Sequence, residues 1–321
     1  MSLQLSKNIL VTVAYYDVLN YPLTVFEIWK YLTRIEKNGG GKKVMEDQRY
    51  NLGEIVNELD SNENLRRFIE EHQGFYFLRG RSGLVESRLD NNKLSIEKYK
   101  ISRRVVKWLR YVPYVRMAAL TGTLAMKNTK DDSDLDFFIM IKGGRIWTGR
   151  TLATVVIHLL GKRRYGEKVK DRVCLNYFIA SDSLEIDRQD LFASNEYTFI
   201  FPIFGFKQFR KFCERNKWIS NFKINWVYPK VKPTKVGSHT KSSRAVQRFL
   251  EKMIDFFGGD WLENKLRAWE IKRIERNPNT SKFGSYIRYS DKNLIFFPEP
   301  QGPRVFEEFK RRLKVLTRQT G

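Results

Sequence analysis

The sequence predicts an α+β protein: a small mixed sheet flanked by helices, preceded by a helix-and-hairpin domain and followed by a basic, mainly helical region. Three short apolar runs rich in β-branched and aromatic residues predict the strands, at Val115–Leu120, Phe137–Ile141 and Val173–Ala180. Residues 145–160 have the pattern of a helix that covers these strands. The 321 residues are 42% hydrophobic and 14% aromatic, which suffices for a substantial core in two or three domains.

The composition excludes several classes of protein. The two cysteines, Cys174 and Cys213, form no CxxC or Cys/His cluster, so neither a disulfide framework nor a zinc site is expected. This cysteine usage fits a reducing cytoplasm. We expect no secretory leader, because no small-residue cleavage site follows the first apolar segment. The most apolar later window, 146–160, is too short and too polar to span a bilayer, so no membrane partner is expected.

The net charge of +23 is concentrated in one part of the chain. Residues 1–100 hold 15 Lys+Arg against 14 Asp+Glu, whereas residues 101–321 hold 44 against 22. A field of this sign favours nucleic acid, nucleotide or another polyanion as partner. An incidentally basic surface is the alternative.

Residues 1–85 predict three helices and a hairpin, an order similar to that of a winged helix. The helices are expected at 8–20, at 24–32 behind a Thr24-x-x-Glu27 capping box, and at 51–59 behind Asn51-x-x-Glu54. The hairpin is expected at 68–78, turning at Gln73-Gly74.

Winged helices usually bind DNA through their third helix, but here that segment is acidic. Residues 45–63 hold one base, Arg49, against six acids: Glu46, Asp47, Glu54, Glu58, Asp60 and Glu63. Such a surface repels phosphates, so we interpret the domain as a packing or protein-interaction module. The aromatic residues that form either a partner patch or a core are Tyr15, Tyr16, Trp29 and Tyr31.

Residues 86–222 begin with a linking helix, 86–110, whose apolar side is expected to hold Ile101, Val105, Trp108 and Leu109. The segment Val115–Ile141 follows, with Gly122-Thr123 after its first strand, a short helix at 124–129, and Asp134-Leu135-Asp136 at the start of its second strand. Alternate strand residues share a face, so the two carboxylates should project together. They repel unless a cation lies between them, and Mg²⁺ is commonly held by one or two carboxylates plus substrate phosphates.

This motif resembles the DNA polymerase beta-like nucleotidyltransferase superfamily, in which Gly-Ser or Gly-Thr precedes an Asp-x-Asp strand. The resemblance implies that Asp134 and Asp136 are catalytic and ligate two Mg²⁺ ions, with Mn²⁺ as a substitute. It also implies a nucleoside triphosphate bound by Gly122, Thr123, Lys127 and Asn176. An acidic turn entering an ordinary buried strand is the alternative.

The family normally places a third carboxylate on the next strand, as metal ligand and general base. On Val173–Ala180, alternation predicts Val173, Leu175, Tyr177 and Ile179 on one side, with Cys174 and Asn176 on the other. The expected acid is therefore replaced by Asn176 or Cys174. Asp171 and Asp182, at the two ends of the strand, are less well placed substitutes.

Basic segments follow. The run 162–172 is interpreted either as holding a triphosphate or nucleic acid, or as a solvated loop. Residues 223–248 hold seven basic residues and no acidic ones, which predicts a linker or mobile loop over the active face. Helices at 244–257, 261–276 and 303–316 and a hairpin at 286–295 complete the third region, 223–321.

The resemblance therefore implies a cytoplasmic Mg²⁺-dependent nucleotidyltransferase that moves an NMP from an NTP to an acceptor hydroxyl, and the basic second half of the chain favours RNA or DNA as the acceptor. The alternatives are a weak or inactive nucleotidyltransferase fold that binds nucleotide or nucleic acid, and a winged-helix regulator.

Overall fold

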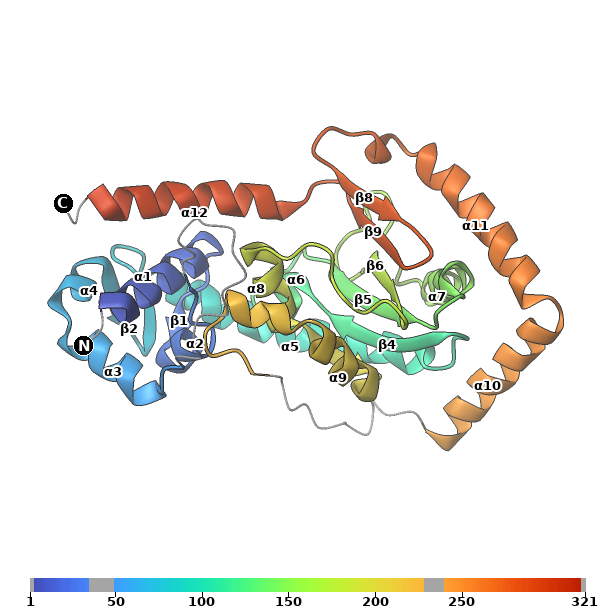
Figure 1. Cartoon of the computed structure of the whole chain (residues 1–321), viewed down its shortest axis with the longest axis horizontal. Coiled ribbons are helices and arrows are strands. Elements are labelled where there is room, and N and C mark those ends of the chain that lie inside the picture. Colours follow the sequence, from blue (N-terminus) through green and yellow to red (C-terminus); the bar gives the residue numbers. More distant parts are fainter. Residues whose placement is uncertain (1–2, 35–48, 228–239, 319–321) are drawn as a thin grey trace.

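The computed structural model describes residues 3–34, 49–227 and 240–318, which form a mixed α+β fold. The described residues contain twelve α-helices, a three-stranded antiparallel sheet and a six-stranded mixed sheet (Figure 1). The α+β class predicted from the sequence is therefore confirmed.

The N-terminal unit contains the predicted helices and hairpin. Its elements are α1 (Leu3–Val18), β1 (Leu23–Thr24), α2 (Val25–Lys30), α3 (Leu52–Ser61), α4 (Glu63–Phe68), β2 (Ile69–His72) and β3 (Phe75–Leu78). Both predicted capping boxes are present, at Thr24 with Glu27 and at Asn51 with Glu54. The hairpin turns at Gln73 and Gly74, which both have positive φ. The sequence did not predict α4 or the short strand β1, which pairs with β3.

The core of this unit contains residues from all three predicted domains. Phe199, Ile224 and Phe309 are buried together with side chains of α1, α2 and α3. Figure 1 shows the last helix, α12 (Gln301–Arg318), lying along α1. Tyr15, Tyr16 and Tyr31 are buried here, so these three belong to the core, which was one of the two alternatives for the N-terminal aromatic residues. Trp29 is half-buried.

The six-stranded sheet has the order β7-β4-β5-β6-β9-β8. Its strands are β4 (Val115–Leu120), β5 (Leu135–Ile141), β6 (Val173–Ala180), β7 (Phe201–Phe204), β8 (Tyr286–Tyr289) and β9 (Asn293–Phe297). Only β5 and β6 are parallel, and α7 (Ile146–Leu159) connects them. The bounds of β4 and β6 match the prediction.

Helices cover both faces of this sheet. One face packs against α5 (Leu84–Leu109) and α7, and the other against α8 (Leu191–Phe199) and α9 (Phe206–Arg215). Alternation along β5 places Leu135 and Phe137 in the α5/α7 core and leaves Asp136 on the α8/α9 side. Trp108 was expected on the apolar side of the linking helix, but its side chain is 57% exposed, because Val105, Val106 and Leu109 fill that side.

The C-terminal region contributes both helices and strands. Helices α10 (Lys241–Phe256) and α11 (Gly259–Glu275) form the arm at the right of Figure 1, and the β8–β9 hairpin extends the sheet beside β6. Two 3-10 helices, Lys217–Asn221 and Pro278–Thr280, complete the described elements. Residues 228–239 of the predicted loop lie outside the described residues. No helix in the described ranges has the length and apolar character needed to cross a bilayer.

Candidate active site

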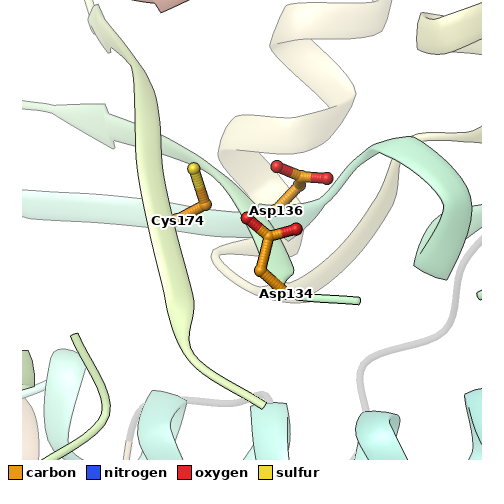
Figure 2. A group of neighbouring side chains, drawn as sticks. All are labelled: Asp134, Asp136 and Cys174. Carbon is orange, nitrogen blue, oxygen red and sulfur yellow. The ribbon is translucent and has the colours of Figure 1, made fainter. Parts of the chain in front are cut away.

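Two carboxylates at the start of β5 and a thiol of the neighbouring strand β6 converge in front of the sheet. Asp134 precedes β5, Asp136 is its second residue, and Cys174 is the second residue of β6. One carboxylate oxygen of each aspartate and the Cys174 sulfur all lie within 4.8 Å of one another (Figure 2). The two carboxylates therefore project together, as their alternate positions on the strand predict.

Gly122 lies against this pair at the end of β4. It begins the single-turn helix α6 (Gly122–Ala125), which starts two residues earlier and is shorter than predicted. Its φ is +62°, and a Cβ built on it would lie 2.6 Å from Asp136 Oδ2. The Thr121 amide donates to the carbonyl of Asp136 at 3.1 Å, which fixes the loop to the strand. Only glycine fits both the backbone conformation and the carboxylate at this position.

The charge of the pair is only partly compensated. Burial, reinforced by the negative charges of Asp134 and Glu196, raises the pKa of Asp136 to about 7. The Arg164 guanidinium opposes this rise, and so does Asn176, whose Nδ2 donates to Asp136 Oδ1 at 3.0 Å. Arg164 pairs with Asp134 and lies 3.7 Å from the Cys174 sulfur. Its guanidinium thus supplies positive charge where the sequence predicts a metal ion.

The side chains of β6 do not alternate as predicted, because the strand contains a register shift. Asp136 lies opposite Cys174, but Phe138 lies opposite Tyr177. Val173 and Leu175 therefore pack on the α7 side of the sheet, whereas Tyr177 and Ile179 pack on the α8 side. Burial, followed by the charges of Asp136 and Asp134, raises the pKa of the Cys174 thiol to about 12.

Three of the predicted candidates lie away from the pair. Asp171 is paired with Lys98 at 2.8 Å, and the Asp182 carboxylate lies against Gly143. The Lys127 side chain is exposed, and the backbone carbonyl of Lys127 accepts a hydrogen bond from Arg88 at 3.0 Å. None of the three lines the large cavity in front of the pair.

A cavity of about 1150 Å³ opens in front of the pair. Gly122, Thr123, Asp134, Asp136 and Asn176 all line it, so five of the six predicted site residues are brought together.

Sequence reasoning missed Glu196, which α8 presents to the same cavity. Burial raises the pKa of its carboxyl to about 7, opposed by Arg188 and reinforced by Asp190. In the sequence, Glu196 is the only charged residue of the segment Leu191–Phe199, and an isolated acid in such a segment is a signal that could have identified it.

The donor set fits a hard divalent cation. Two carboxylates are the ligands that Mg²⁺ and Mn²⁺ prefer, and the Asn176 amide oxygen is a neutral ligand of the same type. A cation between the carboxylates would relieve the repulsion that raises the pKa of Asp136. Cys174, with its raised thiol pKa, is a poor ligand for such an ion.

Comparisons of the chain with models of protein families, with curated proteins and with solved structures give no match.

Proposed function

We propose that the protein is a metal-dependent nucleotidyltransferase that transfers an NMP from an NTP to an acceptor hydroxyl. The observation that carries this proposal is the convergence of Asp134 and Asp136 on a cavity wall, against a glycine whose missing Cβ leaves room for the second carboxylate. The resemblance in sequence to the DNA polymerase beta-like superfamily supports the same reaction.

Each residue of the site has a role in this proposal. Asp134 and Asp136 hold Mg²⁺ or Mn²⁺, which supplies charge neutralisation at the transferring phosphoryl group when bound. Gly122 lets the backbone of the β4–α6 turn approach the triphosphate, and the exposed Thr123 lines the cavity beside it with a hydroxyl donor. Arg164, now paired with Asp134, is placed to pair with a phosphate once a cation takes its position.

Glu196 is the proposed proton acceptor in place of the third carboxylate that β6 lacks. Its carboxyl lines the same cavity and lies close enough to Asp136 to raise the pKa of that residue. A pKa of about 7 suits a general base that takes a proton from the acceptor hydroxyl near neutral pH. Asn176 cannot take a proton, because it carries an amide.

The N-terminal unit is proposed to be a winged-helix-like domain with a packing role. Its core is closed by Phe309 and Leu316 of α12 and by Ile224, so its apolar surface is used within the chain. On α3, Glu58 is buried and accepts hydrogen bonds from Ser6 and Asn62, while the acids Glu54 and Asp60 remain on the outer surface. The negative charge of these residues argues against binding of α3 in the major groove of DNA.

The second candidate is a nucleotidyltransferase fold that binds nucleotide or nucleic acid without catalysis. The observation that favours it is the occupation of β6 by Cys174 and Asn176 where the resemblance implies an acid. The pairing of Asp134 with Arg164 also points in this direction, because it reduces the negative charge available to a metal.

A transfer assay separates the two candidates. The protein is incubated with each labelled NTP, with Mg²⁺ or Mn²⁺, and with RNA, DNA or small hydroxyl acceptors. Label transfer that is lost in Asp134→Asn and Asp136→Asn, and kept in Asp131→Asn, supports the enzyme. Asp131 is a suitable control because it lies in the same turn but pairs with Lys170 at the surface. Binding of NTP without transfer under every condition supports the second candidate.

A further inference from the structure

The cavity has a second charged end, opposite in sign to the aspartate pair. Three arginines from separate segments line it: Arg150 on α7, Arg163 before β6 and Arg273 on α11. The Arg150 guanidinium lies 4.7 Å from the ring centre of Phe296 and 5.7 Å from that of Phe178. Phe178 belongs to the core on the α7 side, so this end of the cavity lies on the opposite side of the sheet from Asp136.

Positive charge exceeds negative charge at this end. Glu270 is the nearby acid, and it is already engaged by Arg150 and by the Thr151 hydroxyl, which donates to it at 2.6 Å. Within the described residues, Arg163 and Arg273 form no ion pair. The cavity-lining acids Asp187 and Glu299 are paired elsewhere, with Arg288 and Lys282. The fold therefore holds two uncompensated guanidinium groups beside a third.

The three arginines are close enough to repel one another. Burial, reinforced by the positive charges of Arg273 and Arg163, lowers the pKa of Arg150 to about 9. Arg150 Nε is also buried without a hydrogen-bond partner among the described residues. A buried donor without a partner costs about 1–3 kcal/mol, and an anionic oxygen would relieve both this cost and the repulsion.

Trp269 provides an aromatic wall next to this charge. Its side chain is 54% exposed and lines the cavity, and the Arg273 guanidinium lies 5.6 Å from its ring centre. Trp269 and Arg273 are four residues apart on α11, which places them on one helix face. The exposed part of the ring offers an apolar surface to the body of a ligand beside the guanidinium.

Consecutive residues, Arg163 and Arg164, contribute to the two ends of the cavity. Arg164 contacts Asp134, and its neighbour Arg163 forms a backbone bridge to Val173 at the start of β6. Successive residues of an extended segment point to opposite sides, so this segment contributes one guanidinium to each end. Both ends belong to the same cavity, and this segment lies between them.

We propose that Arg150, Arg163 and Arg273 form a subsite for a phosphate monoester carried by the acceptor. Guanidinium groups bind phosphate through paired N–H donors, and three of them match its charge and its several oxygens. The role of this phosphate as part of the acceptor rests on the proposed transferase function, whereas its binding does not.

The test measures binding without NTP or metal, so that it is independent of catalysis. Titration calorimetry at physiological salt uses inorganic phosphate, a hexose 6-phosphate, and an RNA oligomer with a 5′-phosphate or a 5′-hydroxyl. We expect the affinity for phosphate monoesters to fall at least tenfold in Arg163→Gln with Arg273→Gln, and to fall less in Arg273→Lys. Lys272→Gln, at an exposed neighbour on α11, removes one positive charge, as each of the two arginine substitutions does, and should bind as the wild type does.

Comparing the affinities of the titrated ligands identifies the molecule that carries the phosphate. Preference for the hexose phosphate assigns a small phosphorylated acceptor, and preference for the 5′-phosphorylated oligomer over its hydroxyl form assigns a nucleic-acid end. Absence of phosphate binding overturns the subsite. Equal affinity in the wild type and the double variant, or an equal loss in Lys272→Gln, also overturns it. A transfer assay that fails while phosphate binds to the arginines removes the proposed function but leaves the subsite intact.

Discussion

The two ends of the cavity differ in how the chain builds them. At the acidic end, Asp134 and Asp136 are two residues apart at the start of β5, and one cation, Arg164, lies beside them. At the arginine end, the basic groups come from three distant segments, and one acid, Glu270, lies among them. A strand's alternation produces the first cluster locally, whereas only the packing of α7 and α11 produces the second.

Burial and like charges shift the pKa values at both ends of the cavity for the same physical reason. Burial and like charge raise the pKa of Asp136 to about 7 and lower that of Arg150 to about 9, so each shift favours the neutral form. A cation relieves the first end and an anion relieves the second. One phosphate-bearing substrate with its metal ion satisfies both requirements, which is why we interpret the two ends as parts of one site.

The largest effect is expected from Gly122→Ala at the acidic end. The new Cβ would lie 2.6 Å from Asp136 Oδ2 and would displace that carboxylate, and a displacement of about 1 Å can cost about 100-fold in rate. Gly144→Ala is the matched control, because Gly144 also has positive φ, at +72°, but has open space around it. Each variant should lose about 1–2 kcal/mol of stability from backbone strain, measured by denaturant unfolding.

Transfer activity, or divalent-cation affinity if there is no transfer, then separates the two glycines. We expect the loss only in Gly122→Ala. An equal loss in both variants would show that backbone strain, and not the contact with Asp136, controls the acidic end.

The sequence was most informative where structure is local. The capping boxes at Thr24 and Asn51 satisfy the amide groups that begin their own helices, so they fix those helices without tertiary help. The shared direction of Asp134 and Asp136 follows from the period of a strand, and the turn at Gly122 follows from its freedom at positive φ.

The sequence was least informative where tertiary packing determines the position or exposure of a side chain. The register shift on β6 moves Tyr177 and Ile179 to the α8 side, and nothing in the apolar run marks it. Trp108 is exposed because its neighbours on α5 already fill the groove, and the aromatic residues of α1 are core because α12 covers them. Glu196 belongs to the site only because α8 lies across the sheet.

The next largest effect is expected from Glu270→Gln at the arginine end. Removing the one acid leaves buried Arg150 without its partner, and breaking such a pair costs about 3–5 kcal/mol. Phosphate or sulfate should restore part of the lost stability, because an anion replaces the missing charge. Thermal unfolding with and without phosphate measures this, with Glu275→Gln, an exposed acid on the same helix, as control. If phosphate stabilises the wild type and both variants equally, the anion acts elsewhere.

A third effect concerns pH at the acidic end, in the presence of a chelator. Since the folded pKa of Asp136, about 7, exceeds its unfolded value of about 3.9, the native state binds more protons than the unfolded state between these limits. Asp136 therefore lowers stability progressively as pH rises from about 4 to 7, and the loss is complete above 7. Asp136→Asn should be more stable than the wild type at pH 8 and equally stable near pH 4.

Unfolding in urea at several pH values measures this difference. Mg²⁺ should stabilise the wild type at pH 8 and leave Asp136→Asn unchanged, because the variant has lost one of the two carboxylate ligands. A constant difference between the proteins across the range would mean that Asp136 titrates in the folded state as it does in the unfolded chain.

The smallest effect, a change of several-fold, is expected from Asn176→Asp. The Asn176 amide now donates to Asp136, and a carboxylate in its place would add a third negative charge beside the pair. Without metal this variant should be less stable than the wild type, because repulsion increases. With Mg²⁺ it should bind the ion more tightly and, if the protein transfers NMP, react several-fold faster.

Asn279→Asp is the control, since Asn279 also lines the cavity but is not among the groups that contact the pair. Tighter metal binding in Asn176→Asp without faster transfer would assign proton removal to another group, and Glu196→Gln should then remove the activity that remains. Tighter binding in both asparagine variants would instead show that the cation responds to the charge of the whole cavity, so that the two ends do not act as separate electrostatic sites.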